Sequence, residues 1–161
     1  MKIGVISDTH SKMHSRVFDL FAGVDHILHA GDIGKPEIIT ELRSIAPVTA
    51  VYGNIDSFPL VSQFPERIVL TFEGCKILMT HIVDDRTAQG IRRLIHSTNE
   101  PEVSVIIYGH THVARIEVVE NVNVLLFNPG SAGPARWQTK PSVGLLTLDS
   151  GKPPSAEILW L

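Results

Sequence analysis

The chain has 161 residues, of which 43% are hydrophobic and 19% are charged, and its formal net charge is −3 at pH 7. This length suits one domain and the hydrophobic share is enough for a core, so we expect residues 1–161 to form a single domain. The acidic balance excludes a broad basic surface, and stable nucleic-acid binding is therefore not expected.

Membrane insertion and secretion are also not expected. The longest apolar runs, such as residues 103–108, are far shorter than the roughly 20 residues that a membrane-spanning helix needs. The first residues, MKIGVIS, lack the long apolar stretch of a secretory signal. Cys75 is the only cysteine, which excludes an internal disulfide and fits a reducing compartment. We therefore expect a cytoplasmic protein.

In chain order, the first half alternates strands and helices. Strands are predicted at 2–6, 26–29 and 47–51, with helices at about 14–22 and 35–44 between them. This βαβαβ order implies parallel strands. The second half is richer in strands, predicted at 67–73, 75–80, 103–108, 113–119, 122–127 and 142–148, with a helix near 85–97. Gly74 separates the first two of these strands and predicts a hairpin. The pattern as a whole predicts an α/β fold.

Metal-capable side chains follow five strand-like runs. The motifs are VISDTH (5–10), LHAGDIG (28–34), VYGNID (51–56), ILMTH (77–81) and IIYGHTH (106–112). The candidate metal-binding residues in them are Asp8, His10, Asp32, Asn54, His81, His110 and His112. One such motif has little weight, because turns favour Gly and Asp in any case. Five such motifs at strand ends carry more weight, because α/β sheets bind ligands at the carboxyl ends of their strands. Together they predict a two-metal hydrolase in which the Asp32 carboxylate is shared by both ions.

The order Asp-x-His, Gly-Asp, Gly-Asn, His, Gly-His-x-His resembles the calcineurin-like metallophosphoesterases. It is most similar to their short bacterial and archaeal phosphodiesterase branch, which is related to the retromer subunit Vps29. The resemblance extends from Ile3 to about Leu148 and includes the NPGSAGPAR stretch at 128–136. It implies a four-layer α/β/β/α sandwich.

The resemblance also implies two divalent metal ions per chain. Asp8, His10 and His112 would bind one ion, Asn54, His81 and His110 the other, and Asp32 both. Manganese is the first expectation from the resemblance. Imidazole with carboxylate and amide oxygens equally suits nickel, iron, zinc or cobalt, and this choice stays open.

One departure from the family pattern concerns the general acid. Where many members continue the Gly-Asn motif with a histidine that helps to protonate the leaving group, this chain has Ile55. An isoleucine cannot donate a proton, so about 10²- to 10⁴-fold of acid catalysis has to come from elsewhere. Substrates with poor leaving groups are therefore disfavoured.

A second departure follows His81, where related sequences often read Thr-His-Gly-His and this chain has Ile82 and Val83. The metal ligand is kept, but a polar contact near the substrate is lost. Asp84 and Asp85 either replace that polarity or cap the helix predicted to start there, and capping is the favoured interpretation.

The expected activity is hydrolysis of a phosphodiester by a hydroxide that bridges two metal ions. Asp32, Asn54 and His110 are the expected catalytic residues, and Asn54 and Arg136 are the expected substrate contacts. The substrate is expected to be a small phosphoester, with a cyclic nucleotide or short oligonucleotide suggested by the resemblance. Two alternatives stay open: a Vps29-like protein-interaction scaffold, and a phosphomonoesterase acting on a nucleotide or sugar phosphate.

The remaining histidines, His14, His26, His29 and His96, are expected to be structural, although His29 could instead orient Asp32. The glycines and polar residues of 128–136 are expected to stabilise the metal edge or to line the pocket. Trp137 and Trp160 fit either a homo-oligomer interface or the core.

Overall fold

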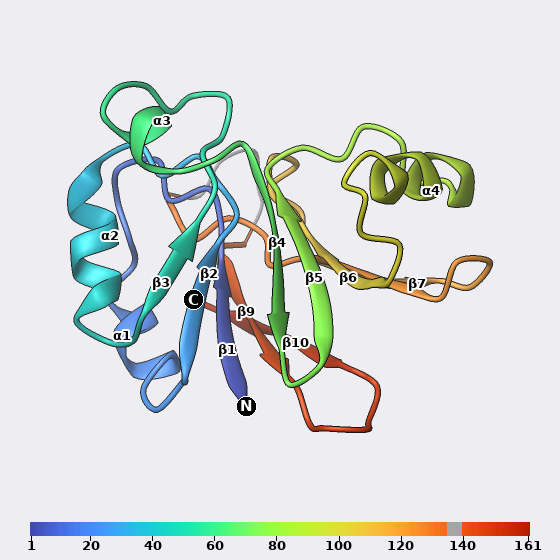
Figure 1. The fold of residues 1–161 in the computed structure, drawn as a ribbon. Helices are drawn as coiled ribbons and strands as arrows, with labels where there is room; N and C mark the ends of the chain where they lie inside the picture. The colour runs from blue at the N-terminus through green and yellow to red at the C-terminus, as the bar shows by residue number, and fades with distance from the viewer. Residues whose placement is uncertain (135–139) are drawn as a thin grey trace.

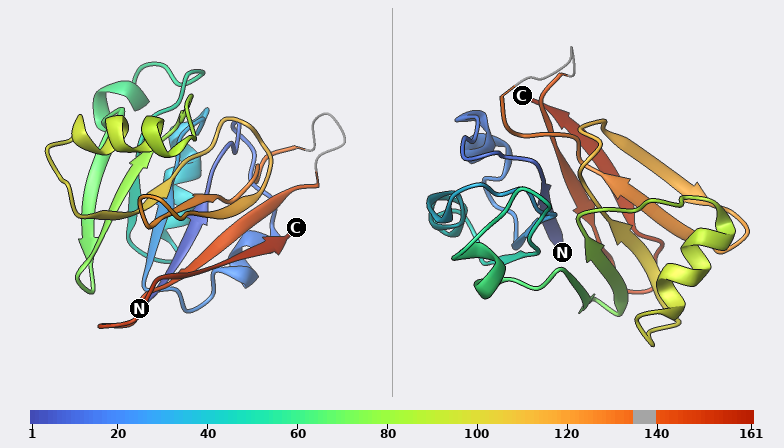
Figure 2. Two further views of the ribbon diagram at one scale, coloured as in Figure 1. Left: turned by 90° about the vertical axis from the view of Figure 1, so that its right-hand side faces the viewer. Right: turned by 90° about the horizontal axis from the view of Figure 1, so that it is seen from above.

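The strands form two five-stranded sheets that pack face to face, with helices on both outer sides (Figures 1 and 2). A computed structural model describes residues 1–134 and 140–161. The helices are α1 (Arg16–Leu20), α2 (Pro36–Arg43), α3 (Leu60–Gln63) and α4 (Ala88–His96). The strands are β1 (Lys2–Ile6), β2 (His26–His29), β3 (Val48–Ala50), β4 (Arg67–Phe72), β5 (Cys75–Thr80), β6 (Val103–Ile107), β7 (Arg115–Val119), β8 (Val124–Asn128), β9 (Ser142–Thr147) and β10 (Ser155–Trp160).

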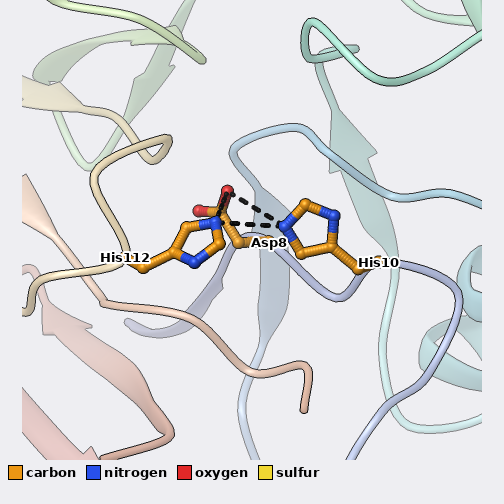
Figure 3. Close-up of side chains that lie close together, drawn as sticks. All are labelled: Asp8, His10 and His112. Atoms are coloured by element: carbon orange, nitrogen blue, oxygen red, sulfur yellow. Dashed lines mark hydrogen bonds and ion pairs between the residues drawn. The ribbon is translucent and has the colours of Figure 1, made fainter. Parts of the chain in front are cut away.

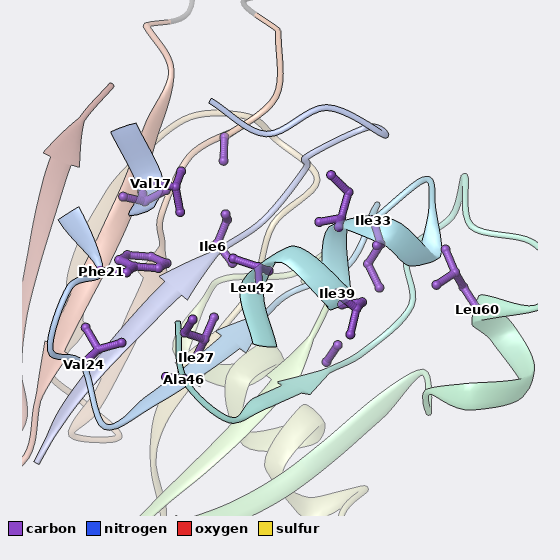
Figure 4. Packing of buried hydrophobic residues seen from close by; sticks show 14 residues of the cluster. Ile6, Val17, Phe21, Val24, Ile27, Ile33, Ile39, Leu42, Ala46 and Leu60 are labelled. Carbon is purple, nitrogen blue, oxygen red and sulfur yellow. The ribbon is translucent and has the colours of Figure 1, made fainter. Parts of the chain in front are cut away.

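The first sheet has the order β10-β9-β1-β2-β3, and β1, β2 and β3 run parallel as the βαβαβ pattern predicts. Helices α1 and α2 cover its outer face (Figure 4). Val17 and Phe21 face the sheet from the α1 side, and Ile39 and Leu42 face it from α2, at helical spacing. Burying these side chains is what fixes the helices on the sheet.

The second sheet has the order β4-β5-β6-β8-β7. Strands β4 and β5 form the antiparallel hairpin predicted at Gly74, and β5, β6 and β8 run parallel. Ile91 and Ile95 of α4 pack against its outer face. Between the sheets, alternate side chains of the strands form a second core, so the predicted four-layer α/β/β/α sandwich is confirmed.

The structure differs from the sequence-based expectations at three elements. Helix α4 begins at Ala88, because Thr87 caps it by accepting a hydrogen bond from the Gly90 N–H at 3.2 Å. The expectation that Asp84 or Asp85 is the N-cap is therefore wrong. Helix α3 and strand β10 were not predicted. Among the described residues, no helix combines the length and apolarity needed to cross a membrane.

Candidate metal centre

The seven predicted ligand residues lie at the carboxyl ends of β1, β2, β3, β5 and β6, at the upper edge of both sheets in Figure 1. Five of them, Asp8, His10, Asp32, His110 and His112, have φ between +47° and +68°. This left-handed conformation is uncommon for residues other than glycine, and it concentrates at functional sites. The loops are therefore shaped to aim these side chains rather than to continue the strands.

Asp8, His10 and His112 form the first group, with their side chains pointing toward one another (Figure 3). The Nε2 atoms of His10 and His112 lie 3.1 Å apart. Asp8 Oδ1 lies 3.2 Å from His112 Nε2 and 3.8 Å from His10 Nε2. Two imidazoles and a carboxylate oxygen at this spacing are a donor set that divalent transition metals accept.

Asp8, Asp32 and His81 form the second group, and Asp8 is common to both. All three side chains are buried. Asp32 Oδ1 lies 3.2 Å from His81 Nε2, while its Oδ2 faces His10 Nε2 at 3.9 Å. The Asp32 carboxylate thus has one oxygen on the side of each group, as a carboxylate shared by two ions requires.

Two buried polar atoms of the site have no hydrogen-bond partner among the described residues: Asp8 Oδ1 and His81 Nε2. The ring of His81 is fixed because its Nδ1 lies 2.7 Å from the Ala30 carbonyl, which can only accept a hydrogen bond. In a neutral ring, Nε2 then presents a lone pair toward Asp32. A lone pair facing a carboxylate in a buried site is costly unless a proton or cation neutralises it, so the residues fit a metal ion.

Asn54 and His110 are exposed, unlike the buried carboxylates. Asn54 Oδ1 and His110 Nδ1 lie 3.0 Å apart, and the His110 ring meets the His81 ring edge-on with 5.4 Å between centroids. The structure thus brings the remaining predicted ligands to the same edge, on the side of His81. Their exposure leaves them accessible to a substrate.

The pKa values in the buried group reflect the close contact of acid and imidazole. Burial raises the pKa of Asp32, but the His81 contact and the Ile55 N–H lower it by more, so it lies below its ordinary value. Burial lowers the pKa of His81, but Asp32 and the charge of Asp8 raise it by more, so it lies above its ordinary value. Both shifts show a site that stabilises positive charge beside its carboxylates.

Asp56 is an important residue that the motif analysis did not single out. Its carboxylate accepts hydrogen bonds from the N–H groups of Ile33 (3.1 Å), Gly34 (2.7 Å) and Gly53 (2.8 Å). These bonds join the loop of Asp32 to the loop of Asn54. The aspartate of GNID was visible in the sequence, but nothing in the sequence shows that it binds backbone atoms of both loops.

His29 does not orient Asp32 directly, because its ring bonds elsewhere. Its Nδ1 accepts from the Gly31 N–H at 3.2 Å, and its Nε2 lies 3.0 Å from Thr9 Oγ1. His26 is half-buried against Thr49, while His14 and His96 are exposed. The structural interpretation of these four histidines agrees with this placement.

Residues 128–134 of the NPGSAGPAR loop bond to the loops that carry the candidate metal ligands. Asn128 Nδ2 donates to the Gly109 carbonyl at 2.8 Å, and Ser131 Oγ donates to the Asp8 carbonyl at 2.9 Å. Arg136 and Trp137 lie outside the described residues. Trp160 is partly exposed on β10, where Lys140 Nζ lies 5.3 Å from its ring centroid.

Comparison with known proteins identifies the family. The calcineurin-like phosphoesterase superfamily domain matches residues 1–151. The chain belongs to this superfamily. A probable metallophosphoesterase from Methanothermobacter thermautotrophicus is 39% identical over 99% of this chain and 92% of its own length. The phosphodiesterase MJ0936 from Methanocaldococcus jannaschii is 31% identical over 81% of this chain and 83% of its own length.

Solved structures show the same fold. A single mutant of Vps29 from Entamoeba histolytica matches with a TM-score of 0.78 at 21% identity, over 100% of this chain and 99% of that one. The phosphoesterase Yfce from E. coli matches with a TM-score of 0.63 at 26% identity, over 91% of this chain and 88% of that one. The metallophosphoesterase family binds divalent metals and acts on phosphoesters, and this chain has candidate metal-binding residues.

Proposed function

We propose that the chain is a phosphodiesterase that uses two divalent metal ions. The observation that carries this proposal is the pair of overlapping groups, Asp8–His10–His112 and Asp8–Asp32–His81, in which the buried atoms Asp8 Oδ1 and His81 Nε2 have no hydrogen-bond partner among the described residues. The match to MJ0936, which is named a phosphodiesterase, supports the choice of a diester.

In this proposal, His10, His112 and Asp8 hold one ion, and His81, Asn54 and His110 hold the other. Asp32 contacts both, which is supported by its two oxygens facing His81 and His10. When bound, the ions supply positive charge to the phosphoryl oxygens and lower the pKa of the attacking water. Manganese remains our first choice of ion, with nickel, iron, zinc or cobalt as alternatives. The single, half-buried Cys75 suits a reducing compartment such as the cytoplasm.

Backbone groups of the protein hold the two carboxylates of the site in place. The backbone N–H of His110 holds Asp8 Oδ2 at 3.1 Å, and the backbone N–H of Ile55 holds Asp32 Oδ1 at 3.1 Å. His110 and Asn54 are the exposed members of the set and therefore face the phosphoryl group. Ile55 is exposed but cannot protonate a leaving oxygen, so esters of acidic alcohols or phenols are the preferred substrates.

The test is hydrolysis of bis(p-nitrophenyl) phosphate by metal-stripped protein to which manganese, nickel, zinc and magnesium are returned one at a time. Turnover is expected to return with at least one ion. Asp32→Asn and His110→Ala are expected to lower it by about 100-fold or more. Asp149→Asn and His96→Ala change exposed residues of the same types away from the site and serve as matched controls. Equal rates in wild type and both ligand variants would contradict the proposal.

Two other functions remain candidates, and Ile55 in place of the general acid favours the first of them, a protein-interaction scaffold. A Vps29-like scaffold predicts two bound ions per chain without turnover of any phosphoester. A phosphomonoesterase predicts faster turnover of p-nitrophenyl phosphate than of the diester. We rank the monoesterase lower, because natural phosphomonoesters have poor leaving groups that need protonation.

A further inference from the structure

A cavity of about 380 Å³ opens beside Asn54 and His81. Its wall combines the loop after β3, the start of β4 and the loop after β5, and its volume lies within the range of about 300–1,000 Å³ of small-molecule sites. Since two of the proposed metal ligands form part of the wall, a phosphorus atom at the metal centre can extend one of its ester arms into this space.

Three charged side chains line the cavity: Glu66, Arg67 and Asp84. Arg67 pairs across the β4–β5 hairpin with Thr80, the residue before His81, which brings its strand directly beside the site. Its Nη1 donates to Ser97 Oγ at 3.0 Å, and the guanidinium has further donors. Neither Glu66 nor Asp84 forms a hydrogen bond or ion pair with another described residue, so both carboxylates are available to a ligand.

The charged side chains that line the cavity determine which kind of ester arm it can accept. Two free carboxylates against one guanidinium repel a second phosphate, because like charges in a partly enclosed site are costly. Ionised carboxylates only accept hydrogen bonds and therefore suit hydroxyl groups, while Arg67 suits a carbonyl or ring acceptor. The half-buried ring of Tyr52 adds a flat apolar surface to the same wall.

We propose that this cavity binds an uncharged, hydroxyl-bearing ester arm with a planar ring, that is, a nucleoside. Glu66 or Asp84 accepts a hydrogen bond from its free sugar hydroxyl, Arg67 donates to its base, and Tyr52 packs on the ring. This inference rests on the proposed phosphodiesterase function and names its substrate class: a diester of which one alcohol is a nucleoside without a further phosphate.

The experiment uses the metal-loaded protein and three substrates with the same p-nitrophenol leaving group. Their other arms are methyl, thymidine attached through its 5′ oxygen, and the same thymidine with a 3′-phosphate. We expect kcat/KM for the thymidine ester to exceed that for the methyl ester about tenfold, mainly through a lower KM. The added 3′-phosphate is expected to lower kcat/KM about tenfold.

Substitutions assign the preference to the cavity. Asp84→Asn is expected to reduce the thymidine-to-methyl ratio of kcat/KM at least fivefold, and Glu66→Gln combined with Asp84→Asn is expected to restore activity on the 3′-phosphorylated ester. Asp149→Asn, at an exposed aspartate between β9 and β10, should leave both ratios unchanged. Circular dichroism spectra of the variants check that each is folded.

The outcomes separate the two proposals. If none of the three esters, nor bis(p-nitrophenyl) phosphate, is hydrolysed with any ion, the proposed function fails. If the methyl ester is hydrolysed but thymidine gives no advantage, or Asp84→Asn leaves the ratio unchanged, the cavity inference alone is overturned. A rate increase on adding the 3′-phosphate would show instead that the cavity accepts an anion.

Discussion

The carboxylate of Asp56 joins the Asp32 loop to the Asn54 loop through three backbone N–H groups, two from Ile33 and Gly34 and one from Gly53. Bonds from N–H groups to an ionised acceptor are among the strong hydrogen bonds of proteins. Asp56 does not itself belong to either candidate metal-binding group. It therefore acts through the position of Asp32 and Asn54.

Asp56→Asn is expected to weaken this link, because an amide NH₂ in place of one oxygen would face a backbone N–H. We expect a loss of about 1–3 kcal/mol in the free energy of unfolding, measured by urea titration of metal-free protein. Manganese affinity, measured by calorimetry, should fall about 10- to 100-fold. Asp149→Asn is the control and should change neither quantity. Unchanged metal affinity in Asp56→Asn would show that the loops keep their positions without this carboxylate.

His29 is fully buried, and burial lowers its pKa from 6.5 to about 4. Its hydrogen bonds need the neutral ring, because Nδ1 accepts from the Gly31 N–H. A histidine with a depressed pKa stabilises the fold above the unfolded pKa. That contribution is lost as the pH falls from about 6.5 toward 4, because the unfolded chain then binds the proton and the folded chain does not.

This linkage predicts that His29 alone makes the metal-free protein about 2 kcal/mol less stable at pH 5 than at pH 7. His29→Gln removes the titrating group. The difference in free energy of unfolding between wild type and His29→Gln should therefore shrink by about that amount between pH 7 and pH 5, in urea titrations with a chelator present. A difference that stays constant with pH would show that His29 titrates normally in the folded protein.

At the level of elements, the loops after β2 and β3 approach each other so closely that a side chain does not fit. A Cβ atom on Gly53 would lie 2.1 Å from Asp32 Oδ1 and 2.4 Å from the Asp32 backbone nitrogen. Contacts below 3.0 Å require movement. The glycine of the Gly-Asn motif thus lets the β3 loop rest against the carboxylate proposed to contact both ions.

Gly53→Ala is expected to displace Asp32 and to lower manganese affinity about 10- to 100-fold, measured by calorimetry on folded protein. The matched control is Gly144→Ala on β9, where the added Cβ would lie 2.3 Å from the Phe127 ring in the core between the sheets. The control should lose stability but keep its metal affinity. Equal losses of affinity in both variants would mean that the effect is general destabilisation.

The elements that the sequence predicted correctly share a simple physical signal. Strands 2–6, 26–29 and 75–80 are apolar runs that end in a small or polar residue, and they match β1, β2 and β5. Helix α3 has four residues, too few to show a helical period. Strand β10 does alternate, with Ala156 and Ile158 turned to the core between the sheets, but it follows two prolines and lies at a sheet edge.

For the candidate site, the sequence predicted the residues that can bind metal but not the contacts that position them. Motifs at strand ends indicate which residue types can bind metal, because parallel strands end at one edge. They do not show hydrogen bonds from backbone groups of other loops, such as those from Ile55 to Asp32 or from His110 to Asp8. Those contacts depend on the packing of two sheets whose strands are distant in sequence. The sequence likewise does not show that Asp8 belongs to both candidate metal-binding groups, because this also depends on how the sheets pack.

For the whole molecule, the core between the two sheets decides whether residues 1–161 behave as one domain. Phe127 of β8 is fully buried in this core, and its ring reaches across to Gly144 of β9 in the other sheet. Each sheet has a separate core with its helices on the outer face. The middle core joins the two sheets along their inner faces, and hydrogen bonds such as that between His81 Nδ1 and the Ala30 carbonyl join them at the edge that carries the candidate metal ligands.

Phe127→Ala is therefore expected to destabilise both halves together, by about 3–5 kcal/mol, and Phe127→Leu by a smaller amount. Methyl NMR signals of Ile27, in the core with α1 and α2, and of Ile106, in the core with α4, report on the two sheets separately. Within each of the three proteins, the two signals should disappear at the same urea concentration, because neither sheet can cover its inner face alone. That concentration should be lower in the variants than in wild type. Loss of one signal before the other would show two units that unfold independently, and the single-domain prediction would then be wrong.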